Sequence, residues 1–181
     1  PLQLLETRGS VIFDTLICLK NDGLVKKIGI SVYSTTELDR IVNKYRPDIV
    51  QAPFNILDRN LIETGWCQKL NDYDIEVHTR SCFLQGVLLM PKDKIPSKLC
   101  LWDRVWKDWD KWIDQIKLTK LEACVRFVKS NDKVDRMVIG VQNPEQLLEI
   151  YSAYNKEGIS APSTLIVNDV RLINPSNWSK L

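Results

Sequence analysis

The chain is poor in the features that would tie it to a membrane or to nucleic acid. No segment approaches the roughly 18 consecutive apolar residues of a membrane-spanning helix, and no signal peptide is visible. The formal net charge is only +2, so no strong field favours nucleic acid or an anionic membrane surface. We therefore expect neither partner, and a cytoplasmic location. Because the chain starts at Pro1 without a leader, we expect it to begin inside a larger protein.

Metal-ligating residues are also scarce. The single histidine is His78, and no two of the five cysteines form a C-x-x-C pair. An odd number of cysteines with this spacing predicts neither a disulfide framework nor a zinc site. We expect buried thiols in a reducing compartment and no bound metal. The cysteines are Cys18, Cys67, Cys82, Cys100 and Cys124.

Short apolar runs recur along the chain and predict four strands. The first, Ile28-Gly29-Ile30-Ser31, is typical of a buried strand. The other three are expected at residues 48–51, 75–79 and 137–139. Because helical patterns separate these runs, the strands are expected to be parallel with right-handed crossovers.

The helical segments carry recognisable start and stop signals. One helix is expected to end at Asn21-Asp22-Gly23, a glycine stop. The next opens at Ser34 with Glu37 three residues on, which is the pattern of a capping box. Asn143-Pro144 begins the last long helix with a favoured cap and a proline in its first turn. That helix carries Leu147, Leu148 and Tyr151.

A tryptophan stripe marks residues 101–116 as a helix, and the tail through Trp178 is expected to be irregular. Acidic residues lie between the tryptophans, whereas a nucleic-acid stacking surface would carry basic ones. The stripe therefore predicts packing in the core or against a partner. Its members are Trp102, Trp106, Trp109 and Ile113.

With 181 residues and 44% hydrophobic content, the chain is long enough for one domain over residues 1–181. A closed (β/α)₈ barrel has eight strands and about 250 residues, so four strands fit either half of a barrel or a small open sheet. Composition alone does not separate these two architectures.

Four ordered segments resemble the aldo-keto reductases. Residues 23–31 look like the lead-in and fifth strand of that family, and 48–55 are similar to its sixth strand and exit loop. Residues 77–88 resemble the seventh strand, and 138–147 the eighth strand with its helix. The resemblance implies an α/β fold that forms the C-terminal portion of a TIM barrel, with about four parallel strands and alternating helices.

The resemblance also implies what the chain lacks. In this family catalysis uses an Asp, a Tyr, a Lys and a His on strands that precede the matched region, so we expect no catalytic residue here and an inactive isolated chain. His78 lies on the seventh strand and does not match the family's histidine. The intact parent would be an NAD(P)H-dependent reductase of small aldehydes or ketones. Two alternatives stay open: a non-catalytic nucleotide-binding barrel and an independent small α/β binding domain.

Three strand-end residues match nicotinamide contacts of the family. Gln51 carries an amide that can pair with a carboxamide, and Ser31 matches the first residue of the family's Ser-Asn pair. Val32 stands where the Asn would be, so this chain departs from the family pattern at the second contact. Arg80 occupies a position where many members stack a tyrosine, and a planar guanidinium can also stack on a flat ring.

The remaining candidate contacts follow the third and fourth strands. The loop after residue 80 would lie along the pyrophosphate, and the start of the last helix would bind a phosphate through its free N–H groups. No Lys or Arg lies between Met137 and Tyr151, and Ile150 replaces a common Asn. These residues offer no charge-assisted contact to a 2′-phosphate, so NAD(H) stays an alternative. The family resemblance itself favours NADP(H). The candidate residues are Ser81, Phe83, Gln85, Gly86, Gly140, Gln142, Asn143 and Gln146.

Overall fold

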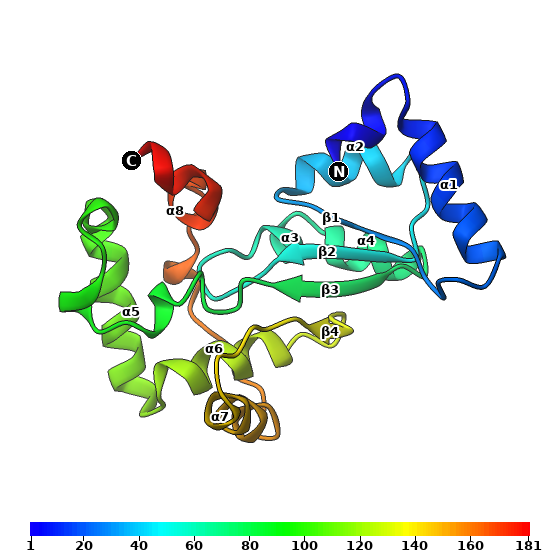
Figure 1. The fold of residues 1–181 in the computed structure, drawn as a ribbon. Helices are drawn as coiled ribbons and strands as arrows, with labels where there is room; N and C mark the ends of the chain where they lie inside the picture. Colours follow the sequence, from blue (N-terminus) through cyan, green and yellow to red (C-terminus); the bar gives the residue numbers. More distant parts are fainter. The chain divides into compact units, whose positions relative to one another are not determined.

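The computed structural model describes all of residues 1–181 and has an α/β architecture (Figure 1). Four strands form one sheet in the order β1-β2-β3-β4, and β1, β2 and β3 pair in parallel. This confirms the predicted fold class. The strands are β1 (Gly29–Ser31), β2 (Ile49–Pro53), β3 (Glu76–Arg80) and β4 (Arg136–Met137).

Helices connect and follow these strands. The glycine stop is confirmed, because the first helix ends at Asn21 and Gly23 adopts a left-handed φ of +73°. None of the helices combines the length and apolar character needed to cross a bilayer. The helices are α1 (Gly9–Asn21), α2 (Thr35–Val42), α3 (Asn60–Glu63), α4 (Trp66–Asp72), α5 (Asp103–Ile116), α6 (Lys120–Lys129), α7 (Pro144–Tyr154) and α8 (Val170–Ile173).

Contacts within the chain separate it into two compact units. The first unit comprises Pro1–Pro53, Asn60–Arg80 and Lys133–Arg136. The second unit comprises Phe54–Arg59, Ser81–Asp132 and Met137–Leu181. Each is described by itself below, and a single domain over residues 1–181 stays a prediction.

In the first unit the strands bury one face and half-expose the other. Val50 and Ala52 of β2 are buried, whereas the residues between them are only partly covered. The same alternation continues in β3, where Val77 and Thr79 are buried. Since side chains alternate across a strand, one face packs in the core and the other carries accessible polar groups. The core is completed by Leu38, Ile41, Val42, Leu61, Trp66 and Leu70.

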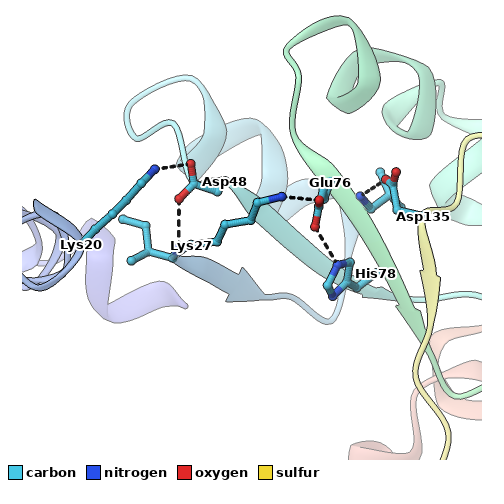
Figure 2. A network of polar contacts seen from close by, with 8 residues as sticks. Lys20, Lys27, Asp48, Glu76, His78 and Asp135 are labelled. Carbon is cyan, nitrogen blue, oxygen red and sulfur yellow. Dashed lines mark hydrogen bonds and ion pairs between the residues drawn. The ribbon is translucent and has the colours of Figure 1, made fainter. Parts of the chain in front are cut away.

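The amino ends of the strands are joined by a polar network (Figure 2). Asp48 accepts hydrogen bonds from the Lys20 ammonium at 2.5 Å and from the Ile28 N–H at 2.9 Å. Burial raises the pKa of Asp48, but these donors outweigh it and hold the pKa below its ordinary value. The network therefore ties α1 and the entry to β1 to the start of β2.

The same network continues onto β3 and β4. Glu76 accepts hydrogen bonds from Lys27 and from His78 Nε2, the latter at 3.2 Å, and both partners lower its pKa. The Asp135 carboxylate accepts from the Val77 N–H at 2.7 Å (Figure 2). Hydrogen bonds and ion pairs at the amino ends of barrel strands stabilise the fold, because catalysis in such folds uses the carboxyl ends.

The second unit is built around tryptophans of α5. Trp106 and Trp109 are almost fully buried, and their indole N–H groups donate to the carbonyl oxygens of Leu99 and Leu88. The predicted core stripe is confirmed for these two residues. Trp112 completes it, whereas Trp102 and Ile113 are only partly buried.

Several local predictions need correction. The Ser34 hydroxyl pairs with Thr36 rather than with a backbone N–H, so no capping box forms there. A capping box forms instead at Thr119 and Glu122. The tail contains α8 and a 3₁₀ turn, Pro175–Lys180, and is not irregular. Of the cysteines, Cys18 and Cys100 are exposed and the other three are buried.

Helix α7 does not bury the face that carries Leu147, Leu148 and Tyr151. Leu147, Leu148 and Tyr151 are exposed. Ile150 and Ala153 are buried instead, and they form a small apolar cluster with Val125. Partly buried side chains pack against this cluster: Phe83, Leu121, Met137 and Ile139.

Candidate functional site

A polar row crosses the half-exposed face of the sheet in the first unit. The strand register pairs Ser31 with Gln51 and Gln51 with His78. Laterally paired residues of parallel strands share a face, so these three side chains lie in one line. The Ser31 hydroxyl donates to Gln51 Oε1 at 3.1 Å. This bond uses the amide oxygen, and the amide nitrogen of Gln51 provides two further donors.

Arg80 extends from the end of β3 to the end of β1. Its Nη2 donates to the carbonyl oxygen of Val32 at 3.0 Å, and its guanidinium carbon lies 4.8 Å from the centre of the Tyr33 ring. Because β2 lies between these strands and neighbouring strands are roughly 4.8 Å apart, Arg80 reaches across the end of β2. The structure thereby brings Ser31, Gln51 and Arg80 to the same edge of the sheet.

Val32 has a structural role at this edge. Its side chain is fully buried, and its N–H donates to the carbonyl oxygen of Gln51 at 2.9 Å. It therefore extends the pairing of β1 with β2 and offers no side chain on the accessible face.

In the second unit, the loop after β3 has an unusual backbone. Ser81, Leu84 and Gln85 adopt φ values of +63°, +46° and +56°, and Gly86 adopts +84°. A left-handed conformation costs a non-glycine residue about 1–3 kcal/mol, and such residues concentrate at functional sites. The loop is held by Asn55, whose amide donates to the carbonyl oxygen of Ser81 at 3.1 Å. This strained loop is therefore a candidate functional segment.

The start of α7 satisfies its own polar groups. Asn143 Oδ1 accepts from the Gln146 N–H at 2.9 Å, which confirms the predicted cap. Gln146 Oε1 in turn accepts from the Gln142 N–H at 2.9 Å. A phosphate at this end would have to replace the Gln146 oxygen, and Glu145 in the first turn opposes an anion. Gly140 has open space around it, since a Cβ there would meet no atom within 4 Å.

The structure thus groups the candidates within units. Ser31, Gln51 and Arg80 converge in the first unit. The second unit holds the loop residues next to one another and Gly140 to Gln146 at the start of α7, with Phe83 turned toward the apolar cluster. Sequence reasoning missed Tyr33, which lies two residues after the first segment of the resemblance, and Asn55, which ends the second segment. No group of three or more His, Cys, Asp or Glu side chains is arranged to hold a metal ion.

Comparison with known proteins identifies the family. The sequence pattern of the aldo/keto reductase family matches residues 9–163, which is most of the chain. The chain belongs to the aldo/keto reductase family. No curated protein matches it significantly.

Solved aldo-keto reductases share the fold. The holo form of aldo-keto reductase AKR11C1 from Bacillus halodurans aligns with a TM-score of 0.64 at 16% identity, covering 82% of this chain and 51% of that one. The glycerol dehydrogenase AKR11B4 from Gluconobacter oxydans aligns with a TM-score of 0.59 at 17% identity, covering 80% and 48%. This chain therefore spans about half the length of these similar structures.

Proposed function

We propose that this aldo/keto reductase chain forms the nucleotide-binding part of an NAD(P)H-dependent carbonyl reductase. The observation that carries the proposal is the convergence of Ser31, Gln51 and Arg80 at the carboxyl edge of β1, β2 and β3. Active sites of (β/α)₈ barrels lie at that edge. When bound, the reduced nicotinamide would supply a hydride to a small aldehyde or ketone.

Gln51 and Ser31 fit the carboxamide of a nicotinamide. The Ser31 hydroxyl already occupies the Gln51 oxygen, so the amide is oriented with its nitrogen available as the donor. A donor is what the carbonyl oxygen of a carboxamide needs. The Ser31 bond would then fix which end of the Gln51 amide meets the nucleotide.

Arg80 fits a flat ring. A planar guanidinium stacks on aromatic faces, and the Arg80 guanidinium carbon already lies over the Tyr33 ring, 4.8 Å from its centre. The bond to the Val32 carbonyl oxygen fixes its position along the sheet edge. We assign it as the residue that supports the nicotinamide plane.

The second-unit candidates are proposed as contacts to the phosphates and the adenosine. The strained loop after β3 contains Ser81, Phe83, Gln85 and Gly86. Its positive φ values support a role in nucleotide binding. At the start of α7 the fit is poorer, because Gln146 caps Gln142 and no cation lies between residues 137 and 151. We retain NADP(H) as the nucleotide on the family's usage, with NAD(H) as the alternative.

Following the family pattern, we propose that the catalytic Asp, Tyr, Lys and His lie outside residues 1–181. The chain alone would then bind nucleotide without turnover. A small carbonyl compound would be the substrate of the whole protein, with no metal required.

The test uses the complete gene product that contains residues 1–181. NADPH and NADH are titrated by nucleotide fluorescence, and nucleotide oxidation is followed with a panel of aldehydes and ketones. We expect binding and turnover, with weaker binding in Gln51→Ala and unchanged binding in Gln68→Ala. Gln68 is the matched control, since it is exposed on α4 and bonds only to Asp72 in its own helix. Absence of nucleotide binding would reject the proposal.

A second candidate is a nucleotide-binding barrel without catalysis. It is favoured by Val32 and Ile150, two family contact positions at which apolar side chains are buried in the core. Binding of nucleotide without oxidation across the carbonyl panel would support it. Turnover would exclude it.

A further inference from the structure

Tyr33 is an exposed aromatic residue at the edge where the candidate contacts converge. It lies between β1 and α2, and half of its surface, 50%, is accessible. Its ring faces the Arg80 guanidinium at 4.8 Å. A ring so exposed contributes little to the core, and the neighbouring Val32 already fills the buried position. The contact with Arg80 is therefore the main interaction of the ring.

The geometry around the stack fixes both partners. The Tyr33 N–H donates to Glu37 Oε2 at 2.7 Å, which attaches the tyrosine backbone to the first turn of α2. The Val32 carbonyl oxygen accepts from Arg80 Nη2 at 3.0 Å. The hydrogen bond holds the guanidinium at the end of β1, where the Tyr33 ring lies beside it. A long arginine side chain held in this way loses less freedom when it meets a ligand.

We propose that Tyr33 is a positioning residue that fixes the plane of the Arg80 guanidinium for stacking against the bound nucleotide. This inference rests on the proposed nucleotide-binding function. Tyr33 acts through Arg80, so its effect on nucleotide affinity depends on the presence of the arginine.

The experiment is a double-mutant cycle in the complete gene product. Tyr33→Leu should raise the dissociation constant for NADPH about three- to fivefold, the size of one exposed cation–π contact. Tyr33→Phe keeps the ring and should bind within about twofold of the unmodified protein. In an Arg80→Leu background, Tyr33→Leu should have no further effect. A structural role would not give this dependence on Arg80.

Tyr73→Leu is the matched control. It removes another tyrosine–arginine stack in the same unit, since Arg46 lies 3.8 Å from the Tyr73 ring centre. It should leave nucleotide affinity unchanged. In the nucleotide-free protein, the Arg80 Nε–H resonance should lose its ring-current shift in Tyr33→Leu and keep it in Tyr33→Phe.

The outcomes separate this proposal from the function on which it rests. No nucleotide binding by the unmodified protein overturns both. A second outcome is that the unmodified protein binds nucleotide, but Tyr33→Leu lowers the affinity as much in the Arg80→Leu background as in the unmodified protein. That outcome overturns the positioning role alone. An Arg80 resonance unaffected by Tyr33→Leu does the same.

Discussion

The Lys156 ammonium donates to Glu122 Oε1 at 2.5 Å and joins α6 to the segment after α7 within the second unit. The other carboxylate oxygen accepts from the Thr119 N–H and hydroxyl, at 3.1 and 3.0 Å. Lys156 first, and then the Thr119 N–H, lower the pKa of Glu122 from 4.5 to about 2. A carboxylate with a lowered pKa couples the stability of this unit to pH.

The first prediction follows from the sign of that shift. The stabilisation is fully present above pH 4.5, the ordinary pKa, and is lost as pH falls toward about 2, the pKa in the folded protein. Glu122→Gln should therefore lower the unfolding free energy near neutral pH by about 1 kcal/mol, a value discounted because Lys156 is half exposed. The difference from the unmodified protein should shrink below pH 4.5. Urea unfolding at a series of pH values measures it.

Glu149→Gln is the control for this measurement. Glu149 is exposed on α7, so its replacement should change stability little at any pH. If the difference in unfolding free energy between Glu122→Gln and the unmodified protein stayed constant down to pH 3, the predicted link between the Glu122 pKa and stability would be wrong.

A second prediction concerns the tryptophans of the second unit. Trp106→Ala should destabilise the protein by about 3–5 kcal/mol, because it opens a cavity and leaves the Leu99 carbonyl oxygen without its indole donor. Trp102→Ala should cost clearly less. Trp102 is only partly buried. Its indole N–H donates to the Asp169 carboxylate, and the Arg171 guanidinium lies over its ring. Unfolding of both variants in guanidinium chloride measures the two losses of unfolding free energy. Equal losses would contradict the assignment of Trp106, rather than Trp102, to the core.

A third prediction concerns close packing between β1 and β2. A Cβ on Gly29 would lie 2.7 Å from the Ile49 carbonyl oxygen and 2.9 Å from its Cβ. Since the obstacle is partly backbone, Gly29→Ala should cost roughly 1–3 kcal/mol. Gly140→Ala should be neutral, because a Cβ there meets nothing within 4 Å. Thermal unfolding compares the two, and a stable Gly29→Ala protein would show that the strands can separate.

The sequence predicts the strands well because buried parallel strands form compact apolar runs. Ile28 to Ser31 and Asp48 to Gln51 both lead into observed strands. The fourth run, 137–139, is different, because only Arg136–Met137 pair as a strand whereas Ile139 packs against an apolar cluster. Apolar character alone does not distinguish strand pairing from packing.

Where the local sequence pattern allows two faces of a helix to be buried, the tertiary contacts determine which one is. In α7, Ile150 and Ala153 pack in an apolar cluster, whereas Leu147 and Leu148 are exposed. The stack of Arg80 on Tyr33 joins residues 47 positions apart, a contact that no periodicity encodes. The candidate contacts at strand ends were predicted through the family resemblance, but the aromatic partner of Arg80 was not.

The last prediction uses the bond between Ser31 and Gln51 to test how the amide is oriented. Gln51→Leu removes the donor proposed for the nicotinamide carboxamide, so NADPH affinity should fall about tenfold, equivalent to one hydrogen bond. Ser31→Ala removes only the group that holds the Gln51 oxygen at 3.1 Å. The amide can then rotate, and affinity should fall by less, about two- to fourfold.

The double variant separates orientation from direct contact. If Ser31 acts by orienting Gln51, the double variant binds NADPH as weakly as Gln51→Leu alone, because contacting residues are not additive. If the two losses multiply, Ser31 contacts the nucleotide independently of Gln51. Fluorescence titration of the four proteins, with unfolding curves to verify that each is folded, distinguishes the two arrangements. The first is expected, because the Ser31 hydroxyl hydrogen is already committed to the Gln51 oxygen.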